Sequence, residues 1–239
     1  MLDHDAALRE RIRSNLAAHD VRPIPPGEHR RAAVAIVVAP SEAGTDPVDP
    51  MAFSPETLAM IPGDISGLTG KMEFVAGGAS FLLCRRASRL GKHGGQWALP
   101  GGRVDEGETV EETARRELHE ELGLQLGPDA VLGRLDDYAT RSGYVITPVV
   151  MWSDRDEVQP NPDEVAHVYR IGLHHLLRDD SPRFVDIPES DRPVVQLPLG
   201  GDLIHAPTAA VLVQFRWVGL DGLAGRRVHD FEQPVFAWR

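Results

Sequence analysis

Several common features are scarce in this sequence of 239 residues. The single cysteine, Cys84, excludes an intramolecular disulfide bond and a cysteine-rich zinc site, and it favours a reducing environment. The longest β-branched apolar run, residues 32–39, is far too short to span a bilayer. The N-terminus has neither the basic nor the apolar segment of a signal peptide. These absences predict a cytoplasmic protein that does not contact a membrane.

Positive charge is also scarce. Lysine and arginine number 25 against 36 aspartate and glutamate residues, which gives a formal net charge of −11. This balance argues against a general nucleic-acid-binding protein, which needs a basic surface. An anionic substrate would also meet a repulsive average field, so any anion site needs local compensation. The composition, 42% hydrophobic and 26% charged, is otherwise ordinary for a globular chain.

The chain is long enough for one domain with a small accessory segment. We expect residues 1–29 to form an N-terminal helix and a proline-containing linker that pack on a main domain, residues 30–239. Residues 208–214 fit either a strand or a helix. Apolar patterning elsewhere predicts strands at 31–39, 80–85, 144–152 and 165–171, a short helix at 173–177, and hairpin strands at 193–198 and 203–204.

Residues 40–70 are the least regular part of the sequence, with five prolines and many small residues. Ser54 followed by proline predicts a short helix at 55–60. Because long irregular loops are often lids, we expect this insertion to be a mobile flap near a cleft.

The most informative segment is a helix predicted at residues 110–122. Thr109 and Glu112 fit a capping box at its start, and Gly123 fits the left-handed residue that ends a helix. On this helix Glu117, Glu120 and Glu121 have the i, i+3, i+4 spacing that puts them on one face.

Like charges at this spacing destabilise a helix on its own, so a cation should compensate them. A hard divalent ion such as Mg²⁺ prefers carboxylate oxygens of this kind. An Arg116–Glu108 pair could also fix the preceding loop against the helix. The alternative for a glutamate-rich helix in general is a solvated acidic face.

The wider pattern is more specific than an acidic face. It reads Gly-x5-Glu-x7-Arg-Glu-U-x-Glu-Glu-x-Gly-U, where U is aliphatic, and it begins at Gly102 and ends at Leu124. This pattern is the Nudix box, so the chain resembles the Nudix hydrolase family. The resemblance implies an α/β fold, an α/β/α sandwich with a mixed β-sheet between helices. It also implies Mg²⁺- or Mn²⁺-dependent hydrolysis of a nucleoside diphosphate linked to another group.

The resemblance assigns roles to the box residues. Metal ligands are expected at Glu117, Glu120 and Glu121, while Glu108 and Gly123 have structural roles. A bound ion would neutralise the phosphates and lower the pKa of a water molecule. The proton acceptor varies among family members.

Catalytic candidates are therefore Glu117, Glu120, Arg116 and Glu164. Glu164 is included because many relatives have an Asn-x-x-Glu stretch here, although it could equally be a turn carboxylate.

The segment before the box is basic. Residues 74–104 contain no aspartate or glutamate but several arginines. This strip could attract an anionic substrate despite the net charge, or its arginines could merely face solvent. The substrate-binding candidates in and after it are Arg86, Arg89, Lys92, His93, Gly101 and Gly102.

Three stretches are similar to the coenzyme A diphosphatase subfamily: residues 82–102, 140–150 and 203–209. The first departs from the subfamily motif at Cys84, Gly91 and Leu99, and the third is a degraded version of its motif, with His205 and Ala206 in place of tryptophan and glycine. The resemblance favours coenzyme A or acyl-coenzyme A, cleaved to 3′,5′-ADP and phosphopantetheine or its acyl form.

Other functions stay open at this point. Hydrolysis of ADP-ribose, NADH or another nucleotide is the alternative within enzymes, and a non-catalytic nucleotide-sensing module is the alternative of another class. In each case the partner is a small nucleotide rather than a nucleic acid, and a homodimer is compatible with the sequence. Aromatic residues that could stack on adenine are Trp97, Tyr144 and Trp152, although a packing role in the core or a strand is favoured for each.

Overall fold

The computed structural model describes residues 1–25, 27, 29–48, 53–87 and 95–238. Its elements are four helices and two sheets within these ranges. None of the described helices combines the length and the apolar character that a membrane span requires. The helices are α1 (Ala6–Ala17), α2 (Pro55–Met60), α3 (Val110–Leu122) and α4 (Thr208–Gln214), and α4 continues as a wider π-type turn over Phe215–Leu220.

The large sheet is mixed, and its central strands are β1 (Arg30–Ser41), β2 (Gly78–Arg86) and β7 (Tyr144–Trp152). β1 runs parallel to β7 and antiparallel to β2. The remaining strands pair at the edges or ends of these three. They are β3 (Trp97–Ala98), β4 (Gly101–Arg103), β5 (Val131–Arg134), β6 (Tyr138–Ala139) and β8 (Val165–Gly172).

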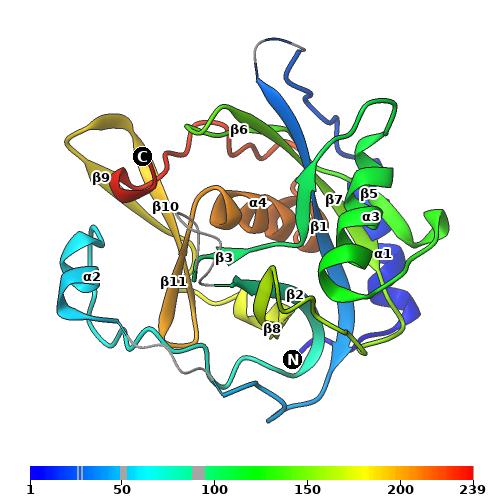
Figure 1. Ribbon diagram of the computed structural model, residues 1–239, viewed down its shortest axis with the longest axis horizontal. Helices are drawn as coiled ribbons and strands as arrows, with labels where there is room; N and C mark the ends of the chain where they lie inside the picture. Colours follow the sequence, from blue (N-terminus) through cyan, green and yellow to red (C-terminus); the bar gives the residue numbers. More distant parts are fainter. Residues whose placement is uncertain (26, 28, 49–52, 88–94, 239) are drawn as a thin grey trace.

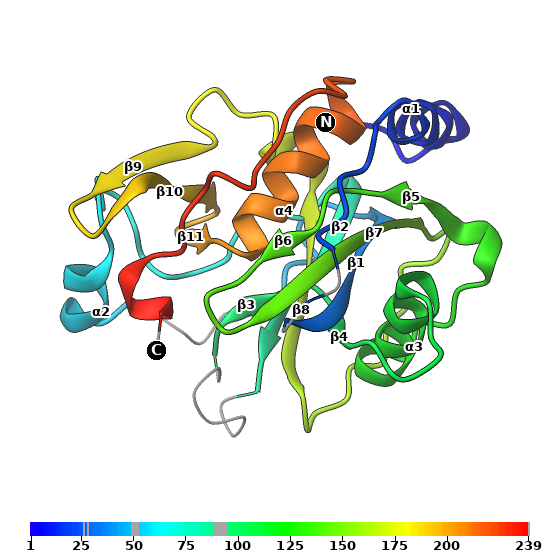
Figure 2. The same cartoon turned by 90° about the horizontal axis from the view of Figure 1, so that it is seen from above.

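Helices cover both faces of this sheet. α3 lies on one face, and α1 and α4 lie on the other (Figures 1 and 2). The alternation of β1 explains the two layers, because its successive side chains point to opposite faces. Ala33, Ala35 and Val37 join the core under α3, while Ile36 and Val38 join the core under α1 and α4. The expected α/β/α sandwich is therefore confirmed.

A second, smaller sheet stands at the end of the molecule away from α3. It contains β9 (Arg183–Ile187), β10 (Ser190–Leu199) and β11 (Asp202–His205), all antiparallel. Hydrogen bonds fasten the insertion to it: the Thr69 and Gly70 N–H groups both donate to the Gly201 carbonyl at 2.9 Å. The Gln196 side chain also donates to the Pro62 carbonyl at 2.8 Å.

The Asp136 cluster joins the N-terminal segment to the rest of the protein. The Asp136 carboxylate is buried and accepts bonds from the side chains of His19, Gln214 and Arg227 at 2.8–3.0 Å. It also accepts the backbone N–H of Arg22 at 2.8 Å. These donors hold its pKa below the usual value although burial opposes the shift. One carboxylate thus ties α1, the linker, the sheet and α4 together.

Most predicted elements are found, with shifted ends. The strand predicted at 144–152 and the helix at 110–122 have the predicted bounds. Residues 208–214 are helical, which excludes their strand reading. The helix predicted at 173–177 was wrong in type, because only a 3₁₀ turn forms at Leu173–His175. Residues 40–41 belong to β1 rather than to the insertion, because they pair with Ala79 and Gly78 of β2.

Candidate active site

The local sequence of α3 sets its two ends. The Thr109 hydroxyl accepts the Glu112 N–H at 3.2 Å, and the Glu112 carboxylate accepts the Thr109 N–H at 2.8 Å. This capping box fixes the helix start. Gly123 ends the helix with φ +64°, a conformation in which glycine avoids the strain of a Cβ atom. The helix therefore ends at Gly123, as the sequence predicts.

The carboxylate face of α3, which is Glu117, Glu120 and Glu121, lies against β4. Glu121 is only 4% exposed, and one of its oxygens accepts the Gly101 N–H at 3.2 Å. Burial raises the pKa of Glu121 to about 7, with Arg86 and that backbone bond opposing the rise. Burial also raises the pKa of Glu117. Both carboxylates therefore lack full compensation of their negative charge.

Arg116 organises the other side of this face. Its Nε donates to Glu108 at 2.8 Å, and its Nη1 donates to Glu117 at 2.8 Å and to Glu120 at 3.0 Å. The bonded guanidinium, with Thr113 adding a further bond, lowers the pKa of Glu108 to about 2. We call Arg116, Glu108, Glu117 and Glu120 the Arg116 cluster. It confirms the expected Arg116–Glu108 pair.

Glu164 comes to this face from the loop that precedes β8. Its negative charge raises the pKa of both Glu117 and Glu121, so it lies within electrostatic reach of them. The Asn161 amide donates to a Glu164 oxygen at 3.2 Å and orients it. The structure thus brings Glu164 to the carboxylate face, as its inclusion among the candidates requires.

These residues fit a hard divalent cation in donor type and in charge. Glu121 is a buried carboxylate whose pKa is raised first by burial and further by the neighbouring carboxylates, and Glu117, Glu120 and Glu164 add oxygen donors. As the side chains stand, the described part of the chain holds no group of three or more metal-binding residues close enough to share an ion. The reason is that Arg116 draws Glu117 and Glu120 to itself, while the Gly101 N–H holds Glu121.

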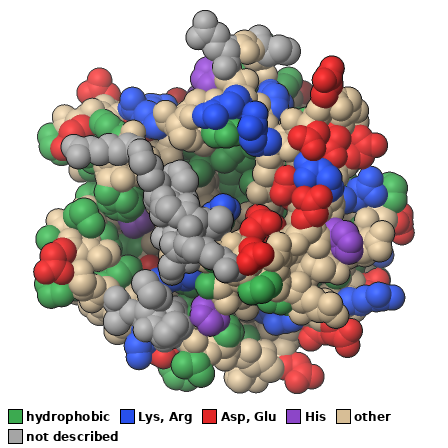
Figure 3. All heavy atoms as spheres, viewed as in Figure 1, with side chains coloured by type: hydrophobic (Ala, Val, Ile, Leu, Met, Phe, Trp, Pro, Cys, Tyr) green, Lys and Arg blue, Asp and Glu red, His purple; other side chains and the backbone are tan. Residues whose placement is uncertain are grey.

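A cavity of about 750 Å³ opens beside this face, within the range that holds a drug-sized ligand. Figure 3 shows acidic side chains next to a hollow lined by hydrophobic ones. All three β4 residues line the cavity, and they also contact α3. A Cβ on Gly102 would stand 2.2 Å from a Glu117 oxygen, and the Arg103 carbonyl accepts Arg116 at 3.1 Å. β4 therefore links the carboxylates to the cavity.

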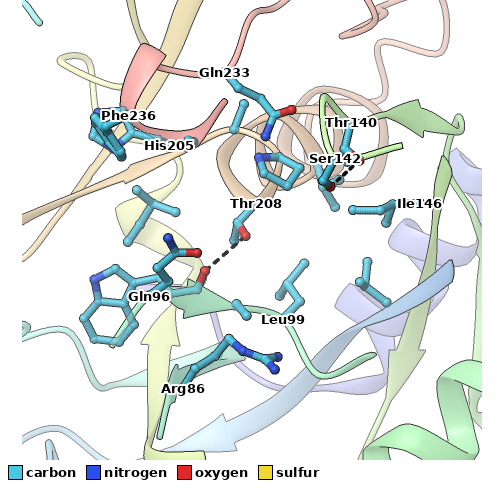
Figure 4. Close-up of a pocket in the computed structure, with 18 of the residues that line it drawn as sticks. Arg86, Gln96, Leu99, Thr140, Ser142, Ile146, His205, Thr208, Gln233 and Phe236 are labelled. Carbon is cyan, nitrogen blue, oxygen red and sulfur yellow. Dashed lines mark hydrogen bonds between the residues drawn. The ribbon is translucent and has the colours of Figure 1, made fainter. Parts of the chain in front are cut away.

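The predicted substrate-binding residues separate into two groups. Arg86, Gly101 and Gly102 line the cavity, and Figure 4 places Arg86 on the wall opposite Phe236. Three further candidates, Arg89, Lys92 and His93, lie outside the described residues.

One arginine of the basic strip has a different role. Arg85 is buried and bonds to Asp202 at 3.2 Å, so its charge is neutralised. The Trp97 indole donates to the same carboxylate at 2.7 Å.

The aromatic candidates also divide. Trp97 and Tyr144 line the cavity, each beneath an arginine guanidinium. Trp152 stacks on His4 with ring centres 4.0 Å apart and is not part of the cavity lining.

Sequence reasoning missed the far end of the cavity. Apolar side chains from the insertion and from the C-terminal segment line it there: Phe53, Met60, Ile61, Phe236 and Trp238, together called the distal wall. The insertion therefore does lie near the cleft, while its mobility stays a prediction. A signal existed in these apolar residues of otherwise irregular segments, but nothing in the sequence pairs residues 53–61 with residues 236–238.

Comparison with known proteins relates part of the chain to a protein family. Residues 74–191 match the family model of the NUDIX domain. The chain is 37% identical over 110 residues to a protein of Yersinia enterocolitica described as "Uncharacterized Nudix hydrolase NudL", covering 45% of this chain and 56% of that protein. It is 39% identical over 100 residues to the protein of that name from Yersinia pestis, covering 41% of this chain and 50% of the relative. The alignments thus span about half the length of these curated relatives.

A solved structure supports the fold. The MutT/nudix family protein from Enterococcus faecalis has a TM-score of 0.50 with this chain at 17% sequence identity, covering 83% of this chain and 65% of its own. At this identity the likeness concerns the fold alone. It agrees with the mixed sheet and flanking helices described above.

Proposed function

Because residues 74–191 form a Nudix domain, we propose that this chain hydrolyses the diphosphate bond of a nucleoside diphosphate derivative with Mg²⁺ or Mn²⁺. One observation carries the proposal: β4 touches the carboxylate face of α3 on one side and lines the cavity with the same three residues on the other. A diphosphate bound at this end of the cavity would thus stand next to Glu117, Glu120 and Glu121.

The metal site would consist of Glu117, Glu120 and Glu121. A divalent ion bound there supplies charge neutralisation for the phosphates and lowers the pKa of a water molecule. Arg116 keeps Glu117 and Glu120 oriented through its fixed guanidinium fork. Arg86, on the cavity wall and within electrostatic reach of Glu121, is the residue that binds the anionic substrate.

The proton acceptor is a glutamate that is not consumed as a ligand. Glu164 suits this role because Asn161 orients it and its charge reaches Glu117 and Glu121. Glu120 is the other candidate, with a side chain that is 52% exposed. An acceptor must lie within hydrogen-bond reach of the attacking water; neither carboxylate lines the cavity, so each would act from the adjoining carboxylate face.

Coenzyme A or an acyl-coenzyme A is the substrate we favour. The stretches similar to the coenzyme A diphosphatase subfamily include much of the cavity lining. From the second stretch come Thr140, Ser142, Tyr144 and Ile146, and from the third come Leu203, Ile204, His205, Ala206, Pro207 and Thr208. Their convergence on one cavity supports a common substrate with that subfamily.

A substrate screen tests the proposal. Phosphate-containing products are measured with Mg²⁺ or Mn²⁺ over coenzyme A, acyl-coenzyme A, ADP-ribose, NADH and diadenosine polyphosphates. We expect coenzyme A or its thioesters to have the highest kcat/KM, and to yield 3′,5′-ADP with phosphopantetheine or its acyl form. Turnover of ADP-ribose or NADH instead would replace the substrate assignment, and binding without any turnover would favour the nucleotide-sensing module.

A further inference from the structure

The cavity has two chemically different ends. At the β4 end it carries the guanidinium groups of Arg86 and Arg103. The other fully charged side chains of the described lining, Arg85 and Asp202, neutralise each other at 3.2 Å. The distal wall, in contrast, is mainly apolar. Its neighbours in the lining include the uncharged polar residues Thr57 and Gln233, and the Arg141 guanidinium that lies 4.4 Å over the Trp238 ring is paired with Glu232.

The middle of the cavity is uncharged near neutral pH. The His205 ring lies there, with its centroid 5.3 Å from that of Phe236, and its Nε2 is 3.2 Å from the Gln196 amide. Burial lowers the pKa of His205 to about 4, so it carries no positive charge for a second phosphate group. Among the described lining residues, the attraction for an anion is therefore strongest at the β4 end.

Two distal-wall side chains are exposed although they are large and apolar. Met60 is 57% exposed and Phe236 is 42% exposed. They come from segments far apart in the sequence that lie at the same end of the molecule, away from α3 (Figures 1 and 2). Apolar side chains that gather around one cavity and stay exposed indicate a surface that is covered when a ligand binds.

Both segments are held in place by specific bonds. Glu232 accepts Arg141 at 2.5 Å and Arg192 at 2.6 Å, and the Trp238 indole donates to the Gln233 carbonyl at 2.7 Å. The insertion is fastened to the small sheet as described above. These bonds anchor both segments to the rest of the protein, which reduces the cost of ordering the wall on binding.

We propose that the distal wall binds an uncharged alkyl or acyl chain carried by the substrate whose diphosphate lies at the β4 end. The inference rests on the proposed hydrolase function and adds the segment that selects the substrate's other group. Met60 and Phe236 are its specificity-determining residues. A second nucleotide is the competing occupant, since aromatic rings could stack on a base.

A ligand series tests this without turnover. Dissociation constants are measured by titration calorimetry for the full chain in EDTA with coenzyme A, S-butyl-coenzyme A and S-octyl-coenzyme A. Burial of each methylene strengthens binding by up to about fourfold, so S-octyl-coenzyme A should bind at least about tenfold more tightly than coenzyme A. Equal affinities along the series, or tighter binding of a dinucleotide such as NADH than of the octyl compound, would overturn the inference.

Variants locate the effect. Met60→Ser with Phe236→Ser should reduce the ratio of the affinity for S-octyl-coenzyme A to the affinity for coenzyme A to about twofold. The matched controls are Val48→Ser and Phe74→Ser, which remove apolar side chains that are 87% and 88% exposed and are not part of the cavity lining. A preference that survives the double substitution would remove the distal wall from the explanation.

A second series separates this inference from the proposed function. ADP and its β-hexyl and β-octyl esters replace the coenzyme A series. If coenzyme A is neither bound nor hydrolysed but affinity rises along the ADP esters, the apolar subsite stands and the coenzyme A assignment fails. If neither series shows a dependence on chain length while coenzyme A is hydrolysed, the proposed function stands and the subsite is wrong.

Discussion

The Arg116 cluster and the Asp136 cluster both combine carboxylates with hydrogen-bond donors, but in opposite numbers. In the Arg116 cluster one guanidinium faces three carboxylates at the protein surface. In the Asp136 cluster one buried carboxylate receives donors from His19, Gln214 and Arg227. The first leaves negative charge uncompensated and suits a cation, whereas the second is satisfied and joins parts of the chain. The ratio of donors to acceptors thus distinguishes a candidate site from a structural junction.

Removing one charge from the surface cluster should have the largest effect on activity. Glu120→Gln keeps the shape of the side chain but removes the carboxylate that we propose as a metal ligand or proton acceptor. We expect kcat to fall about 10³-fold, since metal-assisted charge stabilisation supplies several kcal/mol, with little change in thermal stability. Glu106→Gln, an exposed neighbour in the preceding loop, is the control. An active Glu120→Gln enzyme would remove Glu120 from the chemistry.

Removing charge from the buried cluster should act on stability instead. Asp136→Asn leaves the partly buried Arg227 guanidinium without its counter-charge, which we expect to cost about 3 kcal/mol of unfolding free energy. Chemical denaturation measures this loss, and kcat of the remaining folded protein should be unchanged. The control, Asp180→Asn, breaks a surface pair with Arg178 and should cost less than about 1 kcal/mol. Similar losses for both variants would contradict the distinction between the clusters.

A substitution that keeps charge but changes geometry sharpens the comparison. Arg116→Lys retains a cation but loses the fork that bonds Glu108, Glu117 and Glu120 together. Changes to residues that orient metal ligands typically cost 10–100-fold, so we expect kcat/KM to fall within that range. Arg115→Lys, one position earlier on α3, should leave it unchanged. Full activity in the Arg116 variant would show that charge alone suffices there.

The smallest expected effect is the change with pH in the contribution of Asp136 to the free energy of unfolding. The pKa of Asp136 is lower in the folded protein than its value of about 4 in the unfolded chain. Its contribution is therefore fully present above about pH 4 and is lost as the pH falls through the folded value. The difference in unfolding free energy between wild type and Asp136→Asn should thus shrink from pH 7 to pH 3. A constant difference would show that this carboxylate does not titrate with folding.

Local sequence patterns were enough to predict much of the fold and the carboxylate face of the candidate site. The capping box and Gly123 defined α3, and the i, i+3, i+4 glutamates defined its face. Contacts between residues far apart in the sequence could not be predicted from it. Arg85 looked like part of an anion-binding strip, but it bonds to Asp202, which lies 117 positions away. The distal wall was missed for the same reason, because it depends on how the insertion and the C-terminal segment pack beside one cavity.

The two segments that form the distal wall, residues 53–61 and 236–238, both lie outside the region matched to the NUDIX domain. Helix α3 and its β4 partner lie within it. Substitutions in these two segments can therefore change the far end of the cavity without touching the carboxylate face. If the proposed function holds, a lineage could acquire new substrates by drift in these segments alone, and an engineer could exchange both as a cassette.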